Sequence, residues 1–492
     1  MKLSFPRKHM LGLAVALVIS GQAFATGNEA IINQTSTSAA EGNLAEVTQS
    51  GDINLAVVDQ NGALNTTAIT QNGVWTEAYT FVAGDDNQVR IEQTDEWHIS
   101  IVDIAGQENT TTATQSGFFN QAEIVVAGDT NDAAVTQAGE QNEAFVTLTG
   151  NTNLAEIDQS GNGNWANAGF VGNENELMVL QEGNNNEAGM FNLTGNANTF
   201  ASEQYGDGNV GGVVGVQGDN NDVAVFQDGN TNVFIAFDVN GNNNLVDVYQ
   251  RGDGNQFLLE PLAGDDNIVA IDQRGNGNVI EAPAGLVGND NQIDVWQNGD
   301  ANSAVFATVG DGHNVEIRQQ GDGNVSEMVL IGANNIGNIY SNGDNNTAGI
   351  GFDGANNLAE IRQRGDDNFA VVDVIGDDNT FDIEQSGTQN EALFTSDVAV
   401  SANTVTVSQD GGINLVDILL AGNANSIDIL QSGTGNWVAG DNGYFAVTGD
   451  NGLVNITQQG NDNLVLGSQG GSANLMTVTQ VGDFNTAIVV QN

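Results

Sequence analysis

The sequence predicts an all-β solenoid (β-helix), a rod of about 21 stacked coils in which each coil is strand, turn, strand, turn. Three observations predict this fold. A glycine is followed three residues later by an asparagine about every eleven residues along most of the chain. From Gln71 to Gln181, a glutamine recurs regularly at twice that interval. Between the turns, alternate residues are apolar, as in strands with one buried face.

The segment 1–25 is predicted to be a secretory signal peptide. It has a basic start, and its apolar run over residues 11–19 is too short to span a bilayer. Ala23-Phe24-Ala25 supplies the small residues of a cleavage site. We therefore expect an exported protein that begins at Thr26.

The composition is strongly acidic. The chain has 63 Asp and Glu against 9 Lys and Arg. Removing the leader, with its three basic residues and no acidic one, takes the formal charge from −54 to −57. A surface of this charge repels nucleic acid, so we expect no nucleic-acid partner. The chain has no cysteine, and the exported fold is therefore expected to hold without disulfides.

Side chains within one repeat are expected to point alternately into and out of the coil. Asn153, Ala155, Ile157 and Gln159 share one parity and form an inner face. The partner strand usually ends on an apolar residue such as Leu148, so the true repeat is a pair of strands, which is one coil. Glycine beside Asp or Asn supplies the tight turns. The predicted turn glycines are Gly51, Gly117, Gly139, Gly161 and Gly365.

Inward amides are predicted to form ladders along the rod. Stacking places identical residues roughly 4.8 Å apart, so each amide can bond the copies above and below it, as in amyloid. A buried amide left unpaired costs about 1–3 kcal/mol, which makes complete ladders the expected state. The predicted ladder and self-assembly residues are Gln49, Asn54, Gln60, Asn65, Gln71, Gln93, Gln115, Asn120, Gln137, Asn142, Gln159, Gln181, Gln363, Gln385, Gln431, Gln469, Gln480 and Gln491.

The repeat is irregular in several places. Pro261 and Pro283 lie one coil apart in lengthened units, where we expect bulges and either a weak point or a bend of the rod. The units near Asp95 and around 396–403 lack their glycine, and residues 436–449 contain an insertion.

The repeat resembles that of a known family. Asn131–Ala144 reads as Asn, five residues, then Gln-x-Gly-x-x-Asn-x-Ala, and residues 109–122 follow the same pattern. This is similar to the repeat of the curlin family, the subunits of bacterial curli-type amyloid fibres, and the similarity covers nearly all of the chain after the leader. It implies an amyloid-like solenoid and a structural subunit of extracellular fibres in the biofilm matrix, acting in adhesion and aggregation.

The resemblance also implies partners and a division of the chain. The expected partners are further copies of this chain, other curlin subunits or a nucleator, and a dedicated outer-membrane secretion channel. Residues 26–42 are expected to be a handle for that channel or a capping segment, and residues 43–492 to be the repeat solenoid.

The chain departs from the family pattern at the second glutamine of the repeat. An apolar residue replaces it in most coils, but glutamine persists near both ends. This difference leaves open whether the chain is a main subunit, a nucleator or a specialised member. The terminal glutamines are Gln49, Gln60 and Gln71 at one end and Gln469, Gln480 and Gln491 at the other.

The sequence gives little indication of catalysis or of a cofactor. His98 and His313 are about ten coils apart and cannot share a metal, and His313 occupies an asparagine ladder position. We therefore predict that the protein is not an enzyme. One acidic column suggests a bound cation such as Ca²⁺, because a carboxylate recurs directly after a glycine in four successive coils. The candidate ligands are Asp300, Asp322, Asp344 and Asp366.

Two classes of function follow from these observations. The first is a fibre subunit that polymerises through the open strands at its ends. The second is a soluble, monomeric acidic solenoid at the cell surface that binds a surface, a polysaccharide or calcium. Ice binding is a third and weaker alternative, because the outward positions lack regular rows of threonine.

Overall fold

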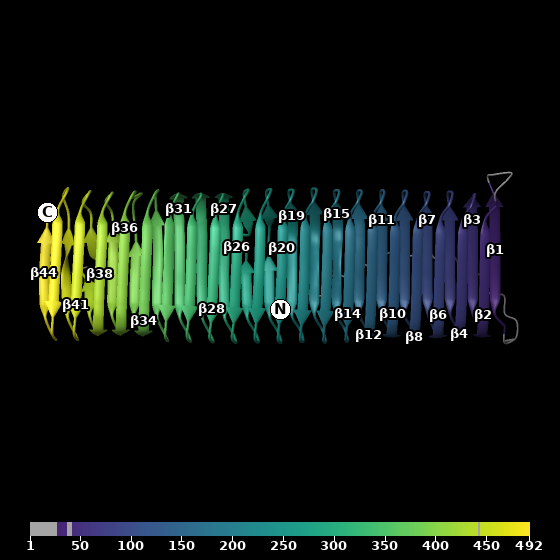
Figure 1. Ribbon diagram of the computed structural model, residues 1–492, viewed down its shortest axis with the longest axis horizontal. Helices are drawn as coiled ribbons and strands as arrows, with labels where there is room; N and C mark the ends of the chain where they lie inside the picture. The colour runs from purple at the N-terminus through teal and green to yellow at the C-terminus, as the bar shows by residue number, and fades with distance from the viewer. Residues whose placement is uncertain (1–26, 37–41, 441–442) are drawn as a thin grey trace.

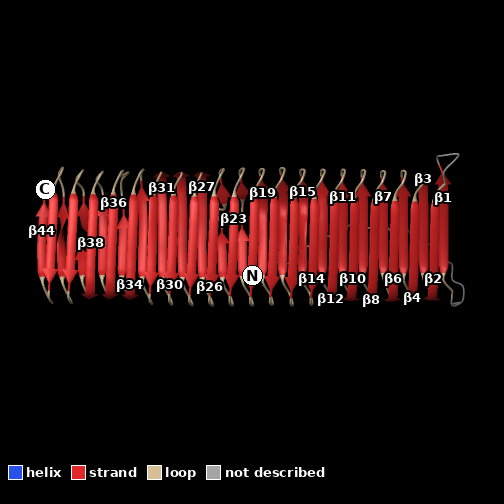
Figure 2. Ribbon diagram, in the orientation of Figure 1, coloured by secondary structure: helices blue, strands red, loops and turns tan. Residues whose placement is uncertain are grey.

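The protein is a straight rod built only of strands and turns. The computed structural model describes residues 27–36, 42–440 and 443–492, and its coils stack along one axis with the two ends of this part of the chain at opposite ends of the rod (Figures 1 and 2). The predicted signal peptide lies outside the described residues. Within the described part, no helix is long and apolar enough to cross a membrane. The predicted all-β solenoid is confirmed.

The strands form two walls, which we call sheet A and sheet B. Sheet A contains β1 (Glu29–Ser36), β3 (Leu55–Gly62), β5 (Glu77–Ala83), β7 (Ile99–Ala105), β9 (Gln121–Ala127), β11 (Glu143–Thr149), β13 (Trp165–Val171), β15 (Glu187–Thr194), β17 (Val210–Gln217), β19 (Val233–Asn240), β21 (Gln256–Leu259), β22 (Leu262–Ala263), β24 (Val279–Ala282), β25 (Leu286–Val287), β27 (Ser303–Asp311), β29 (Val325–Ala333), β31 (Thr347–Ala355), β33 (Phe369–Ile375), β35 (Glu391–Thr395), β37 (Leu415–Leu420), β39 (Trp437–Ala439), β40 (Phe445–Val447), β42 (Leu464–Gln469) and β44 (Thr486–Gln491).

Sheet B faces sheet A across the interior. It contains β2 (Leu44–Asp52), β4 (Thr66–Val74), β6 (Gln88–Glu96), β8 (Thr110–Phe118), β10 (Asp132–Glu140), β12 (Leu154–Asn162), β14 (Glu176–Glu182), β16 (Thr199–Tyr205), β18 (Asp222–Asp228), β20 (Leu245–Arg251), β23 (Ile268–Arg274), β26 (Gln292–Asn298), β28 (Asn314–Gln320), β30 (Ile336–Asn342), β32 (Leu358–Arg364), β34 (Thr380–Thr388), β36 (Thr404–Gly412), β38 (Ser426–Thr434), β41 (Leu453–Gln459) and β43 (Leu475–Val481).

Every strand pairs in parallel with the strand one coil away, and like residues face like residues. In β10 and β12, Ala133 lies beside Ala155, Val135 beside Ile157 and Gln137 beside Gln159. The register is fixed because each strand buries alternate side chains, so a slip of one residue would expose the apolar set.

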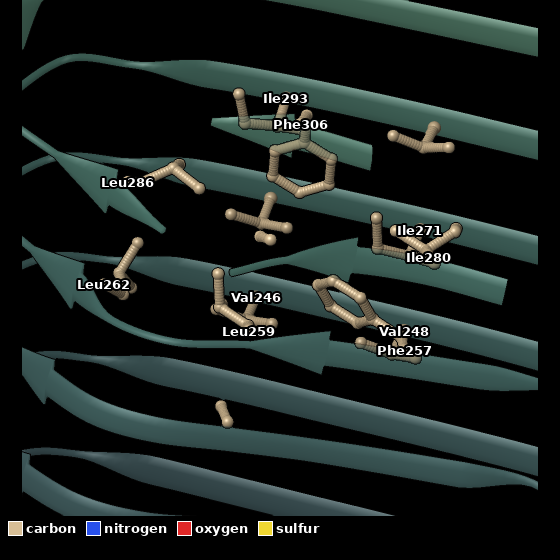
Figure 3. Packing of buried hydrophobic residues seen from close by; sticks show 14 of the residues in the cluster. Val246, Val248, Phe257, Leu259, Leu262, Ile271, Ile280, Leu286, Ile293 and Phe306 are labelled. Carbon is tan, nitrogen blue, oxygen red and sulfur yellow. The ribbon is translucent and has the colours of Figure 1, made fainter. Parts of the chain in front are cut away.

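The core is a narrow apolar seam between the two sheets. Inward residues of sheet B such as Val246 and Ile271 pack against inward residues of sheet A such as Phe257 and Phe306, all of them buried (Figure 3). This seam runs through one continuous cluster from the first coils to the last. Burial of an apolar side chain of this size contributes about 1.5–3 kcal/mol, so most of the stabilisation is shared between neighbouring coils.

The solenoid begins earlier than the sequence analysis placed it. Residues 28–36 were expected to lie in a separate export or capping segment, but β1 pairs with β3 over its whole length. The side chain of Asn28 accepts a hydrogen bond from the backbone N–H of Asn54 (3.0 Å), as a ladder residue does. Asn28, Ala30, Ile32 and Gln34 repeat the inner pattern of the later strands, which explains why this segment joins the stack.

The two prolines interrupt sheet A without bending the rod. Pro261 separates β21 from β22, and Pro283 lies between β24 and β25 in the next coil. Sheet B keeps unbroken strands beside them, from β20 to β26, and the rod is straight here (Figure 1). The predicted interruption is therefore confirmed. Of the two predicted alternatives, the bend is absent from these coils because one intact wall maintains the stacking direction, and the weak point stays a prediction.

The other irregular coils keep their place in the stack by local substitutions. Asp95 takes the position of a turn glycine with a φ of 78°, and Trp97 in the same turn stacks on Trp75 with 5.1 Å between ring centroids. The strands β15, β17 and β19 each carry one extra residue, which makes those coils longer by one than the regular coil. Because these bulges lie on one another, the register of sheet B is not disturbed.

Side-chain ladders and open ends as a candidate self-assembly site

A single glutamine ladder runs along the inner face of sheet B. Each glutamine donates from Nε2 to Oε1 of the glutamine one coil further toward the C-terminus, as from Gln137 to Gln159 and from Gln159 to Gln181, both at 2.9 Å. Each Nε2 also donates to a backbone carbonyl of sheet A, such as that of Gln121 (2.9 Å). The predicted residues in this ladder are Gln49, Gln71, Gln93, Gln115, Gln137, Gln159, Gln181, Gln363, Gln385, Gln431 and Gln480.

The ladder has one substitution that the sequence analysis missed. Ser341 stands at a glutamine position and is too short to span the gap to both neighbours. Gln319 donates instead to the hydroxyl of Ser326 on the opposite wall (2.9 Å), and Ser341 donates to Oε1 of Gln363 (3.1 Å). The break in the regular glutamine spacing at this position is the sequence feature that marks it.

Sheet A has glutamine pairs only at the ends of the rod, within the part of the chain that the structure describes. Gln34 donates to Gln60 at 2.7 Å, and Gln60 in turn donates to the hydroxyl of Thr67 (2.9 Å). At the other end, Gln469 donates to Gln491 at 3.3 Å. The predicted residues Gln60, Gln469 and Gln491 therefore lie in these terminal pairs and not in the long ladder.

Asparagine ladders occupy both corners of the coil. In each, the backbone N–H of one asparagine donates to Oδ1 of the asparagine one coil toward the N-terminus, as from Asn142 to Asn120 (3.0 Å). The amide Nδ2 donates to a turn carbonyl, such as that of Gly161 (2.8 Å). Asn54, Asn120 and Asn142 lie at the corner before sheet A, and Asn65 lies at the corner before sheet B.

The two histidines are rungs of these ladders. The ring of His98 donates from Nε2 to the carbonyl of Thr94 (2.6 Å), and its Nδ1 accepts from the N–H of Asn120 (3.3 Å). His313 makes the equivalent contacts with Val309 and Asn335, both at 3.3 Å. Both imidazoles are buried, and burial lowers the pKa of each from 6.5. The hydrogen bonds to the carbonyls of Thr94 and Val309, and then the nearby Asp95 and Asp311, oppose this shift but are smaller.

Replacing both histidines by asparagine is expected to reduce the sensitivity of the fold to mild acid. A neutral buried imidazole gives stability that is present above the unfolded pKa of 6.5 and is lost as the pH falls through the lower folded pKa. In urea titrations followed by tryptophan fluorescence, we expect wild type to lose more stability than His98→Asn/His313→Asn between about pH 7.5 and about pH 5.

The difference between the two proteins isolates the histidines. Aspartates such as Asp103 and Asp417, whose pKa burial raises, favour the fold as the pH falls, but both proteins share them. Equal stability at pH 8 is the control. Parallel stability curves down to pH 5 would contradict the prediction.

An outer ladder follows the turns and was missed by the sequence analysis. The residue after the turn glycine is Asn or Asp in most coils. Its Oδ1 accepts a hydrogen bond from the backbone N–H of the equivalent residue one coil before. The N–H of Asn162 donates to Asn184 in this way (3.1 Å), and that of Asn184 to Asp207 (2.8 Å). The recurrence of Asn or Asp was interpreted as turn chemistry and, at four aspartates, as a candidate cation column, so the hydrogen bond between coils was not predicted.

The predicted aspartate column is a stretch of this outer ladder. Asp322 accepts from the N–H of Asp300 (2.8 Å), Asp344 from that of Asp322 (2.9 Å) and Asp366 from that of Asp344 (3.0 Å). One oxygen of each accepting carboxylate is therefore already occupied by a backbone donor. In the described chain, no group of three or more Asp, Glu or His is placed to hold a metal ion. A Ca²⁺ bridge along the column stays a prediction.

The turn glycines are required by the close stacking of the corners. A Cβ atom on any of the five predicted glycines would lie within 2.2 Å of the carbonyl oxygen of the residue one coil away. All five also have φ between 92° and 119°, a region that other residues rarely adopt. The five are Gly51, Gly117, Gly139, Gly161 and Gly365, of which Gly365 has φ 108°.

The two outer faces of the rod differ in charge. All six arginines of the described chain lie on sheet B, where Arg318 pairs with Glu316 (2.5 Å) and Arg364 with Glu384 (2.6 Å). Such exposed pairs contribute about 0–1 kcal/mol each, mainly by relieving the repulsion between acids. The outer face of sheet A has no arginine or lysine among the described residues and carries apolar side chains such as Phe81 and Ile331.

Both ends of the rod are open strand edges. In the described part of the chain, β1 and β2 pair only with β3 and β4, and β43 and β44 pair only with β41 and β42. Residues at these ends that would be buried in an inner coil remain accessible, such as Ile32 at 45%. An unpaired edge with exposed inward side chains is a template for a further strand.

Comparison with protein families identifies the repeat. A model described as the curlin associated repeat matches the chain nine times and covers more than half of it. A search of curated proteins found no match. The matched segments are residues 41–73, 65–94, 106–139, 128–161, 288–321, 354–387, 376–411, 422–460 and 449–482.

Proposed function

The chain belongs to the curlin-repeat family, and from this premise we propose that it is a structural subunit of an extracellular, curli-like amyloid fibre. The observation that carries the proposal is the pair of open ends. In the described chain the outermost strands have a partner on one side only, and Nε2 of Gln480 and Gln491 donates only to backbone carbonyls, with no further glutamine to continue the ladder. A second copy stacked end to end would continue both sheets and the ladders, since each coil is built like the next.

Family membership also supports a proposal for how the protein is exported and where the fibre forms. We expect export through the general secretory pathway and a dedicated outer-membrane channel, assembly at the cell surface, and a role in the biofilm matrix. Other curlin subunits, including a nucleator, are the proposed partners. The curlin-repeat family is structural, and the buried ladder amides serve to hold coils together.

Assembly of the purified protein tests the proposal. Residues 26–492, incubated at neutral pH in moderate salt, are expected to form seedable fibres that bind thioflavin T, show cross-β diffraction and have the width of one rod by electron microscopy. Salt is needed because it screens the repulsion between strongly acidic molecules. A rod that stays monomeric and never responds to seeds would contradict the proposal and favour a monomeric surface solenoid.

A matched pair of lysine substitutions in the last strand distinguishes end stacking from other association. Val489 faces inward in β44 and would be buried by the next molecule, whereas the neighbouring Ile488 faces outward and is 71% exposed. Val489→Lys is expected to slow fibre growth by roughly tenfold or more, since it places a charge in the joint. Ile488→Lys is expected to grow at nearly the wild-type rate. Equal rates for the two variants would contradict end stacking.

A further inference from the structure

The rod begins and ends in the same wall. The first strand, β1, and the last strand, β44, both belong to sheet A, while β2 and β43 are the outermost strands of sheet B (Figure 1). We call one wall of a coil, with its turn, a half-coil. The chain alternates between the walls and both its first and its last described strands lie in sheet A, so the described part contains an odd number of half-coils. Two such rods cannot continue one another as a simple repeat.

An unrotated joint would leave a place empty. If β1 of the next molecule stacked on β44, its β2 would lie one half-coil further on, and the place above β43 would have no strand. The backbone donors and acceptors of β43 and β2 would then face a gap, and each buried unpaired group is unfavourable.

A half turn about the rod axis removes the gap. The next molecule then stacks β1 on β43 and β2 on β44, and the chain of half-coils continues without interruption. The half-turn joint is geometrically allowed because the strands of both walls have the same pattern of inward residues. In each wall, this pattern begins at a corner asparagine and ends at the inward residue six positions later.

The side chains of the terminal coils match across this joint, because in the described chain only these coils have glutamine at the last inward position of both walls. In the inner coils, sheet A has an apolar residue at the last inward position, from Val82 near one end to Val447 near the other, except at Thr308 and Ser396. In the end coils it has glutamine, so either wall can meet either wall. The sheet A glutamines are Gln34, Gln60, Gln469 and Gln491.

The hydrogen-bonding capacity is also complementary. Nε2 of Gln480 and of Gln491 donate only to backbone carbonyls in the described chain, of Leu464 (3.1 Å) and Leu475 (3.0 Å). At the other end, Gln34 and Gln49 donate to Gln60 and Gln71, and in the described chain their own Oε1 atoms accept no side-chain bond. The half-turn joint places Gln480 against Gln34 and Gln491 against Gln49, donor against acceptor.

We propose that successive molecules in the fibre are related by a half turn about its axis, with sheet A of each molecule continuing as sheet B of the next. The proposal rests on the proposed function, since it describes the joint of the same fibre. It assigns the terminal glutamines of sheet A as the residues that set the register of the joint, by making the end coils alike on both walls.

Cysteine pairs across the joint test the proposal. The chain has no cysteine, so introduced thiols are the only ones. In the half-turn joint, outward Ile488 of β44 lies beside outward Glu46 of β2, since both stand three residues after their corner asparagines. In the unrotated joint, Ile488 lies beside Ile31 of β1 for the same reason. Neighbouring strands are about 4.8 Å apart, whereas the two walls are about 10 Å apart with these side chains on opposite outer faces.

The experiment compares two double variants of residues 26–492, Ile488→Cys/Glu46→Cys and Ile488→Cys/Ile31→Cys. Each is assembled under reducing conditions, treated with a short bismaleimide, dissolved in formic acid and separated by size. The two thiols of one molecule are on the order of 100 Å apart, so every cross-link joins two molecules. The unassembled monomer, treated in the same way, is the control for random reaction.

The outcomes separate this proposal from the proposed function. Fibres that cross-link into multimers at least tenfold more efficiently through 488 and 46 than through 488 and 31 support the half-turn joint. Fibres that cross-link preferentially through 488 and 31, or equally through both pairs, overturn the joint and leave the fibre function standing. A protein that forms no fibres under seeding overturns both. A Thr477→Cys/Ile31→Cys variant, which reports the other wall of the half-turn joint, is expected to cross-link like the first pair.

Discussion

A Gly275→Ala substitution is expected to lower the free energy of unfolding by about 4 kcal/mol or more and to open the coils on either side. The Cβ of alanine would lie 2.1 Å from the carbonyl oxygen of Gly299, which also accepts a hydrogen bond from Nδ2 of Asn278 (2.8 Å). The φ of Gly275 is 110°, which alanine also avoids. Urea titration, with hydrogen exchange read by mass spectrometry on peptides of the neighbouring coils, would measure the loss.

The same turn offers a matched control. Gly277 has a φ of 64°, and a Cβ placed on it meets no atom within 4 Å. Asparagine tolerates this left-handed conformation, as Asn345 does in another coil with a φ of 56°. Gly277→Asn is therefore expected to change stability by less than about 1 kcal/mol. Comparable destabilisation by both substitutions would show that glycine in this turn serves flexibility and not close stacking.

Interruption of the glutamine ladder is expected to have the second largest effect. Gln319 is buried, accepts from Gln297 (2.8 Å) and donates to the carbonyl of Ser303 (2.9 Å). It also donates to the hydroxyl of Ser326. Gln319→Leu would remove a hydrogen-bond partner from each of these three polar groups, at about 1–3 kcal/mol each, partly offset by the burial of leucine. Nε2 of Gln297 would keep only its bond to the carbonyl of Val279 (3.4 Å). We expect a net loss of roughly 3 kcal/mol or more in the urea titration.

The adjacent residue is the control for this prediction. Gln320 is the next residue of β28 and is exposed, so Gln320→Leu changes the same atoms without touching the ladder. Its effect is expected to stay within about 0.5 kcal/mol. Faster hydrogen exchange in β26 and β30 should accompany the Gln319 substitution alone. A similar effect of the two leucines would remove the ladder as a source of stability.

The regular part of the fold could be predicted because two independent periods agree. Alternation along a strand places Ile157 and Gln159 inward, and the period of one coil places Gln159 against Gln137 and Gln181. Each pattern alone is common, but together they fix the wall, the face and the register. The ladder of sheet B therefore followed from the sequence, including most of its members.

The missed features are those in which one residue type serves two purposes. Asparagine or aspartate after a turn glycine is explained by turn chemistry, so its bond to the next coil, as from Asp207 to Asn230 (3.0 Å), gave no separate pattern. The start at Asn28 was missed because no regular glycine precedes it and the spacing to Asn43 is longer than that of a regular half-coil. The loss of a glutamine at Ser341 is compensated by Ser326 of the opposite wall, which accepts the hydrogen bond of Gln319. The repeat spacing along the sequence does not report such contacts across the core.

The unlike outer faces of the rod have a consequence for how fibres meet sideways. With half-turn joints, the arginine-bearing face of one molecule is followed by the cation-free face of the next, so each flank of the fibre is banded with a repeat of two molecules, on the order of 200 Å. No flank offers an unbroken apolar strip to a neighbouring fibre. Lateral contact must then match bands as well as faces, which favours single filaments and loose networks over fused ribbons.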